Sequence, residues 1–170
     1  VTQKELTLQN PRGLLDALDY SPAVRSDTFG FDPRMDTFNL RGFDSYNTGI
    51  FRDGLRQISA SVGFFKNEPY GIQELTILKG ASSALYGGSS AGGIVDITSK
   101  RPTETPLREV EVQYGSHARK DARFDLSGPA GSSDTVFYRL TGLARDADTE
   151  RLGVKDDRIF IAPAIMWKPD

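Results

Sequence analysis

Residues 70–102 read YGIQELTILKGASSALYGGSSAGGIVDITSKRP, and this stretch decides the fold. Apolar and polar residues alternate over 74–78 and again over 94–98, which predicts two β-strands. The run of small residues at 81–85 suits a short helix. The glycines of 87–93 permit a tight turn and a close approach of the backbone to a neighbouring segment. The pattern indicates an α+β domain.

Helix and strand signals also mix upstream of this stretch. Asn10 is a favourable N-cap and Pro11 suits the first helical position, so residues 10–18 are predicted to form a short helix with its leucines on one face. Short strands are expected at 37–41 and 49–52. The Asp53-Gly54 pair that follows is typical of a two-residue hairpin turn.

Downstream of Pro106 only strand signals are visible. Apolar and charged residues alternate over 109–114, 121–127, 136–145 and 158–168, which predicts four antiparallel strands. Two interpretations remain. The strands form a soluble sheet that needs a covering layer, or they belong to a transmembrane barrel with apolar side chains toward lipid and polar ones toward the lumen. The barrel interpretation places Tyr114 and Trp167 at opposite membrane interfaces.

Composition excludes several classes of protein. The 170 residues contain no cysteine and a single histidine, His117, which excludes disulfides, thiolate nucleophiles and Cys/His zinc sites. The net charge is −2 with both signs interspersed, so we expect no nucleic-acid partner. No stretch approaches the roughly 18–20 apolar residues of a transmembrane helix. The chain begins at Val1 without Met, so we expect a processed or truncated product.

One stretch matches the sequence pattern of a catalytic motif. Residues 88–92 (GSSAG) fit the G-x-S-x-G pattern of hydrolases. His117 is the only available base, and the chain lacks the alternating strands and helices that such enzymes need. No Gly-Lys-Ser/Thr phosphate loop occurs. We therefore predict no enzyme, and we assign no catalytic residue and no metal ligand.

Several motifs together resemble the plug domain of TonB-dependent outer-membrane receptors, and they occur in that family's order: 39–43 (NLRGF), 51–56 (FRDGLR), 64–71 (FFKNEPYG) and the stretch at 74–102. Segments 101–107 and 138–145 (YRLTGLAR) are similar to the barrel start of the ferrichrome and ferrioxamine receptors, which take hydroxamate siderophores. The resemblance implies an α+β plug domain at 1–102, followed at 103–170 by the first four strands of an incomplete transmembrane β-barrel. A barrel that encloses such a plug needs about 22 strands.

The resemblance also implies a function. The protein is expected in the outer membrane of a Gram-negative bacterium, in contact with its lipid, binding ferric siderophore and importing it with energy from TonB. TonB would grip a TonB box upstream of Val1. No cofactor is expected, because iron enters only as the siderophore complex. A receptor for a catecholate siderophore, cobalamin or a glycan is the alternative within the family, and a soluble plug-like binding or signalling domain is the alternative outside it.

Candidate site residues fall into two groups. Adjacent aromatics in a loop, Phe64 and Phe65, are interpreted as a platform at the plug apex that contacts the siderophore. Further ligand contacts are predicted on neighbouring apical loops, at Thr48, Asn47 and Phe29. In the resembling receptors, cations corresponding to Arg41 and Lys79 pair with barrel glutamates and hold the plug to the wall.

Overall fold

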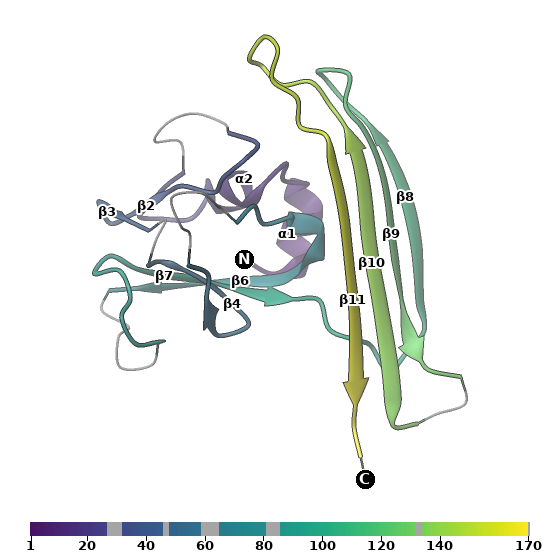
Figure 1. The fold of residues 1–170 in the computed structure, drawn as a ribbon. Helices are drawn as coiled ribbons and strands as arrows, with labels where there is room; N and C mark the ends of the chain where they lie inside the picture. The colour runs from purple at the N-terminus through teal and green to yellow at the C-terminus, as the bar shows by residue number, and fades with distance from the viewer. Residues whose placement is uncertain (27–31, 46–47, 59–64, 81–85, 132–133, 170) are drawn as a thin grey trace. The chain divides into compact units, whose positions relative to one another are not determined.

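The computed structural model describes residues 1–26, 32–45, 48–58, 65–80, 86–131 and 134–169. These form two compact units, Val1–Ser99 and Lys100–Asp170 (Figure 1). The helix predicted at 81–85 lies outside the described residues. None of the helices in the described ranges is long and apolar enough to cross a membrane.

Two short helices begin the first unit, α1 (Gln3–Gln9) and α2 (Leu14–Leu18). A capping box starts α1: the Glu5 amide donates to Thr2 Oγ1 at 3.4 Å, and the Thr2 amide donates to Glu5 Oε2 at 2.7 Å. The prediction that Asn10 is an N-cap was wrong. Asn10 ends α1 in the left-handed region (φ 44°), which asparagine tolerates, and its amide donates to Leu6 O at 2.9 Å.

Two small sheets complete the first unit. One has the antiparallel order β1 (Val24–Arg25), β2 (Asn39–Leu40), β3 (Phe43–Asp44). The other is mixed, with the order β5-β4-β7-β6, and its strands are β4 (Ile50–Arg52), β5 (Leu55–Arg56), β6 (Ile72–Lys79) and β7 (Gly93–Ser99). A 3₁₀ turn, η1 (Pro69–Gly71), leads into β6. The strand predicted at 37–41 is confined to β2, because Arg41 turns the chain with φ 54°.

The hairpin at Asp53-Gly54 is confirmed. Both residues have positive φ, 51° and 79°, as the tight turn between β4 and β5 requires. The turn is held to β7, because Ser99 N donates to Asp53 Oδ1 at 2.9 Å and Gly54 N donates to Asp96 Oδ1 at 3.3 Å. Helices and sheets share one apolar core: Leu6, Leu14, Leu15, Ala17, Leu18, Phe38, Leu40, Ile50, Ile72, Leu75, Val95 and Ile97.

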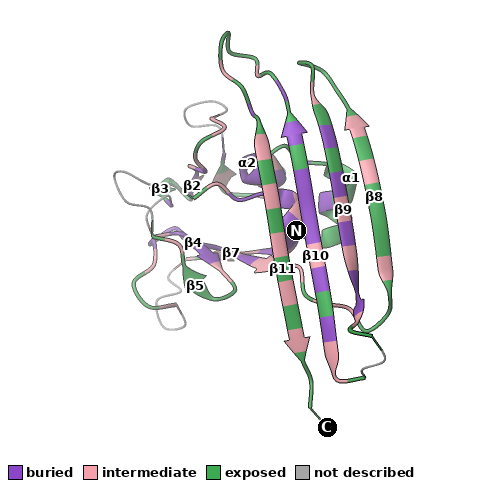
Figure 2. Ribbon diagram, turned by 45° about the vertical axis from the view of Figure 1, so that its right-hand side comes forward, coloured by how far each residue is buried: buried purple, intermediate pink, exposed green. Residues whose placement is uncertain are grey.

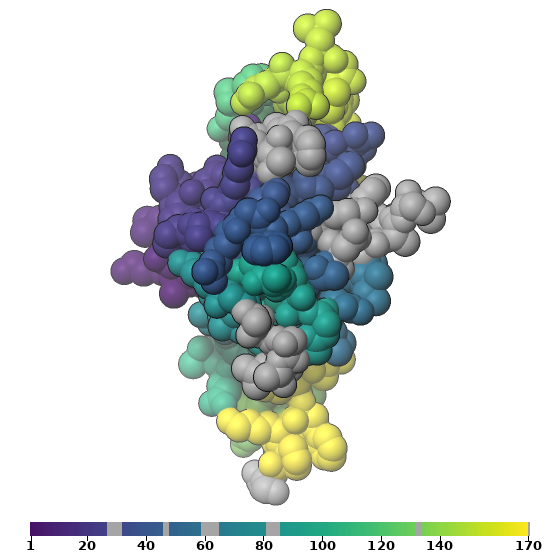
Figure 3. All heavy atoms as spheres, turned by 90° about the vertical axis from the view of Figure 1, so that its left-hand side faces the viewer, coloured from purple at the N-terminus to yellow at the C-terminus, as the bar shows by residue number. Residues whose placement is uncertain are grey.

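Glycines are needed where the segment before β7 passes β2. A Cβ atom at Gly92 would lie 2.0 Å from Leu40 O, and one at Gly93 (φ +128°) would lie 2.1 Å from Leu78 O. On the surface of this unit the segment around residue 43 lies beside the segment around residue 90 (Figure 3), where Ser90 Oγ donates to Asp44 O at 3.4 Å. The close approach that the structure describes is thus to the unit's own strands.

The second unit is an antiparallel meander in the order β11-β10-β9-β8. Its strands are β8 (Leu107–Tyr114), β9 (Lys120–Pro129), β10 (Val136–Asp146) and β11 (Arg158–Trp167). All four predicted strands are confirmed. Tyr114 and Trp167 lie at opposite ends of the sheet, because Tyr114 pairs with Lys120 and Trp167 pairs with Val136.

This sheet is polar on its buried face and apolar on its exposed face. In Figure 2, β9 and β10 alternate between buried and less buried positions along their length. The buried positions form what we call the polar face: Asp121, Arg123, Asp125, Ser127, Arg139, Thr141 and Arg145. The opposite, apolar face carries Val110, Val112, Tyr114, Phe124, Leu126, Tyr138, Leu140, Ile159, Ile161, Ile165 and Trp167. Its exposed fraction reaches 83% at Ile159 and 78% at Val110.

Ion pairs organise the polar face. Asp121 accepts from three arginines, with distances of 2.6 Å to Arg119, 2.7 Å to Arg123 and 3.0 Å to Arg145. A second carboxylate, Asp125, pairs separately with Lys100 and Arg139. Buried charges need partners of this kind, because an unpaired buried carboxylate is costly.

Candidate functional site

Of the predicted ligand residues, Phe65 and Thr48 lie in the described part of the chain, and Phe64, Asn47 and Phe29 lie outside it. Phe65 is 49% exposed and directly precedes a tightly held segment. A large apolar side chain at that exposure is available to a partner. Nothing in the structure tests its contact with a ligand, so the assignment stays a prediction.

The residues after Phe65 are anchored on a buried carboxylate. Lys66 Nζ lies 2.9 Å from Asp36 Oδ1 and also donates to the carbonyl oxygens of Asp32 and Met35 at 3.1 and 3.3 Å. The backbone amide of Asn67 donates to Asp36 Oδ2 at 2.7 Å, and its side-chain amide donates to the same oxygen at 3.1 Å. Asp36 and Asn67 are 3% and 2% exposed. The base of the Phe65 segment is therefore fixed by groups deep in the unit.

Asn67 continues this network into the mixed sheet. Its side-chain oxygen accepts from Arg52 Nη2 at 2.9 Å and from Gln57 Nε2 at 3.2 Å. The other terminal nitrogen of Arg52, Nη1, donates to Ser99 Oγ at 3.2 Å. Burial lowers the pKa of Arg52, and the nearby carboxylates of Asp53 and Asp36 oppose that shift.

Sequence reasoning missed this network. The bonded pairs are separated by 10 to 47 residues along the chain, and polar residues at such spacing show no periodicity. The only signal was the Lys66-Asn67 pair next to the predicted platform. Near it, Arg34 hydrogen-bonds to Asp32 and holds the pKa of that carboxyl at about 2.

Thr48 lies in a different contact set. Its carbonyl accepts from the Ser90 amide at 3.3 Å, which ties it to the glycine-rich segment before β7. In the same region Tyr86 packs its ring edge-on against Phe51 and donates to Asp96 Oδ2 at 3.2 Å. The described residues therefore provide no contact that joins Thr48 to Phe65.

The side chain of one predicted latch cation, Arg41, lies close to the residue that follows the other, Lys79. Arg41 and Lys79 are both exposed, and a Cβ atom on Gly80, the residue after Lys79, would lie 3.5 Å from Arg41 Nη1. Among the described residues neither cation has a recorded carboxylate partner. This is the arrangement of two cations available to an external partner, and their role as a latch stays a prediction.

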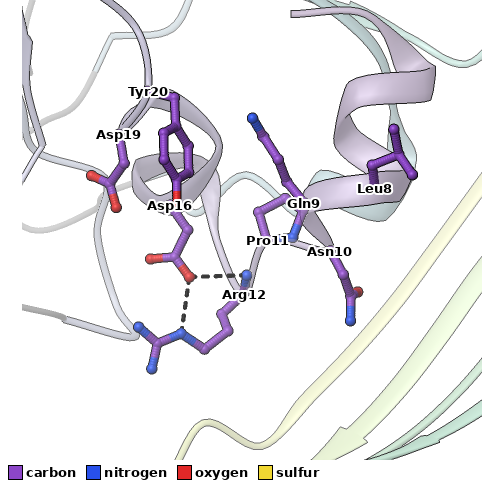
Figure 4. A pocket seen from close by; sticks show the side chains of 8 residues that line it. All are labelled: Leu8, Gln9, Asn10, Pro11, Arg12, Asp16, Asp19 and Tyr20. Atoms are coloured by element: carbon purple, nitrogen blue, oxygen red, sulfur yellow. Dashed lines mark hydrogen bonds and ion pairs between the residues drawn. The ribbon is translucent and has the colours of Figure 1, made fainter.

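A surface hollow lies elsewhere, where α1 ends and α2 begins (Figure 4). It is lined by Leu8, Gln9, Asn10, Pro11, Arg12, Asp16, Asp19 and Tyr20. Arg12 Nε pairs with Asp16 Oδ2 at 2.9 Å within it. The hollow contains none of the predicted site residues. Across the described ranges no cluster of three or more His, Asp or Glu residues could hold a metal ion.

Comparison with known proteins identifies relatives along the whole chain. Residues 1–94 match the family model described as TonB-dependent Receptor Plug Domain. The ferrichrome outer membrane transporter/phage receptor of Escherichia coli K12 is 36% identical over 172 residues, which cover 100% of this chain and 23% of the relative. The ferrioxamine receptor of Yersinia enterocolitica is 37% identical over 175 residues, covering 100% of this chain and 24% of the relative.

Solved structures agree with these sequences. The closed form of the ferric-catecholate import receptor Fiu from E. coli K12 matches with a TM-score of 0.86 and 26% identity, over 98% of this chain and 23% of that one. The ferric preacinetobactin receptor BauA of Acinetobacter baumannii also has a TM-score of 0.86, at 20% identity, over 99% of this chain and 25% of that one, which shows a shared fold. The chain thus spans about a quarter of the length of the relatives it matches.

Proposed function

The chain belongs to the TonB-dependent receptor family of the Gram-negative outer membrane, and on this premise we propose that it is part of a receptor that binds ferric hydroxamate siderophore and imports it with energy from TonB. The protein binds and transports, and it carries out no covalent chemistry. It needs no cofactor, because the siderophore already wraps the ferric ion. Lipid is the partner of the apolar face.

One observation carries the choice of ligand. The ferrichrome and ferrioxamine receptors are 36% and 37% identical to the whole chain, whereas the catecholate receptor Fiu of E. coli O157:H7 is 26% identical over 98% of it. Each of these alignments covers at least 98% of the chain, and so includes both the plug and the strands. It favours a cargo of the hydroxamate class.

Phe65 is proposed to touch this cargo, together with Phe64, Thr48, Asn47 and Phe29. Its exposed ring next to the anchored Lys66 and Asn67 supports the proposal. A bulky iron chelate presents apolar surface between its hydroxamate groups, and a fixed aromatic ring covers such surface without losing much conformational freedom.

The test is a titration of the intact receptor with ferric ferrioxamine and with ferrichrome. A buried Phe side chain contributes about 1.5–3 kcal/mol, so replacing Phe64 and Phe65 with Ala is expected to weaken binding roughly 10-fold to 100-fold. The control is Leu55→Ala, which removes another exposed apolar side chain, from β5. It should leave affinity unchanged.

Three results would contradict this function. Unchanged affinity of the double variant for both siderophores would make the aromatic pair ordinary packing. A large fall in its melting temperature would place the pair in the core of the unit. Tight binding of a ferric catecholate, cobalamin or a glycan by the wild-type receptor, without hydroxamate binding, would reassign the cargo.

A further inference from the structure

The network beneath Phe65 spans the first unit from its predicted ligand platform to its last strand. It starts at Lys66 and Asn67, next to Phe65, passes through Asp36 and Arg52, and ends at Ser99. Ser99 is the last residue of β7 and of the first unit. Each step is an ion pair or hydrogen bond between 2.7 and 3.2 Å.

A buried carboxylate of this kind needs an explanation beyond stability. Asp36 is 3% exposed, and removing it from water is costly even when it is paired. Its two oxygens face donors from two consecutive residues, Lys66 and Asn67, including the Asn67 backbone amide. An apolar side chain could fill the same volume, but it could not fix the direction in which the backbone leaves Phe65.

Arg52 connects this anchor to the end of β7. One of its terminal nitrogens donates to Asn67 and the other donates to Ser99. The Ser99 amide also donates to Asp53 Oδ1 at 2.9 Å, in the turn that directly follows Arg52. Ser99 is thus held through both its hydroxyl and its amide by consecutive residues, and of these two Arg52 also donates to Asn67.

We propose that Asp36 is the positioning residue of the Phe65 platform, and that Arg52 couples occupancy of that platform to the C-terminal end of β7. A ligand that restrains Phe65 restrains Asn67, and through Arg52 it lowers the frequency with which the Ser99 amide opens to solvent. Coupling of this kind requires no displacement, only ordering. The inference rests on the proposed function, because it takes siderophore as the ligand of Phe65.

The test uses hydrogen exchange of the intact receptor, in peptides that cover 65–67 and 97–101, with and without ferric ferrioxamine. Ligand is expected to slow exchange in both peptides of the wild type. Arg52→Met should abolish the slowing at 97–101 while siderophore affinity stays within about threefold, because the open state is rare and contributes little to binding. The matched control is Arg56→Met on β5, whose side chain donates to Gly88 O at 2.7 Å outside the network. In Arg56→Met the ligand should still slow hydrogen exchange at 97–101.

Asp36 is tested by charge removal and by rescue. Asp36→Asn should weaken siderophore binding by about tenfold, the size of one lost well-placed contact, and should speed exchange at 65–67 without ligand. The substitution also removes the carboxylate that pairs with Lys66, so Asp36→Asn combined with Lys66→Met removes that positive charge as well. The double variant should regain the wild-type melting temperature and still bind weakly. Recovery of binding together with stability would show that Asp36 only supports the fold.

Measurements with and without ligand distinguish failure of the proposed function from failure of the coupling through Arg52. If the wild-type receptor binds no hydroxamate siderophore, the proposed function fails, and if Phe65→Ala binds normally, the proposed ligand contact of Phe65 fails. The proposed coupling through Arg52 is tested without ligand. Asp36→Asn must speed hydrogen exchange at 97–101 as well as at 65–67, and the effect at 97–101 must vanish when Arg52→Met is also present. The coupling would be overturned if exchange at 97–101 were the same in Asp36→Asn and wild type. It would also be overturned if ligand still slowed exchange at 97–101 in Arg52→Met.

Discussion

At Gly92 the backbone has no room for a side chain. The Leu40 carbonyl oxygen would lie 2.0 Å from a Cβ atom there, and a second contact, with Phe43 Cβ, would be 3.1 Å. Neither neighbour is the flexible end of a side chain, so the strand itself would have to move. Gly88, four residues earlier, has ordinary space: the nearest atom to its Cβ position is the Arg56 guanidinium at 3.6 Å. We therefore predict different effects on stability for alanine substitutions at Gly92 and Gly88.

We expect Gly92→Ala to destabilise the first unit by about 1–3 kcal/mol, the cost of overpacking a close contact. Gly88→Ala, the matched control in the same segment, should be nearly neutral. Hydrogen exchange of the β7 amides in the intact receptor measures the difference. Equal exchange in the two variants would mean that β2 and the segment before β7 separate without cost.

Among the elements, the strands were the most predictable and the helices the least. Alternation with period two fixes which side chains share a face, so the strands predicted at 109–114, 121–127, 136–145 and 158–168 all formed. Helix α1 was missed, because Thr2 and Glu5 form its capping box at the very start of the chain and Asn10 suits either end of a helix. The Asp36 network was also missed, since contacts between distant polar residues leave no local pattern.

We predict that the apolar face of β8–β11 contacts lipid. Ile161 pairs with Gly142 near the middle of β11 and β10 and is 64% exposed, so in a bilayer it faces hydrocarbon. A charge at such a position costs about 2–4 kcal/mol at the bilayer midplane. We expect Ile161→Arg to reduce the free energy of folding into lipid vesicles by that amount. Leu152→Arg, at a fully exposed position between β10 and β11, should have no effect.

The folding free energy of the intact receptor in vesicles, from urea titration, checks this prediction. Equal stability of Ile161→Arg and wild type would mean that this face meets water or protein. It would then support the alternative of a soluble sheet with a covering layer, because an apolar face of this extent on a soluble protein needs a partner.

On the scale of the whole molecule, the chain leaves the first unit at Ser99 and is immediately fixed again. Lys100 Nζ pairs with Asp125 Oδ2 at 2.8 Å, Arg139 Nη1 donates to Arg101 O at 2.8 Å, and the Thr103 amide donates to Ser127 Oγ at 2.9 Å. Residues 100–103 are thus bound to the polar face of β9 and β10. The covalent link between the units is anchored on the strand side, so any loosening of the first unit must start upstream of Lys100.

Arg41 is where we expect such loosening to start. It is exposed beside Gly80, the residue that follows Lys79, and the pairing of the two cations with glutamates of the barrel is our prediction. Breaking one side of a buried ion pair costs about 3–5 kcal/mol. In the intact receptor, Arg41→Ala is therefore expected to speed hydrogen exchange across the first unit while siderophore affinity changes little, because the predicted role of Arg41 is to hold the wall and that of Phe65 is to contact the ligand.

Arg56→Ala is the control, since it removes another exposed arginine whose described hydrogen bond stays inside the first unit. Its exchange should change only near Gly88. If Arg41→Ala instead abolished siderophore binding and left exchange as in the wild type, Arg41 would belong to the ligand site. The distinction has a mechanical consequence. With the 100–103 segment bound to β9 and β10, we expect that loss of the predicted Arg41 contact lowers the force needed to extract the first unit from its N-terminal side, while the link at Lys100 stays intact.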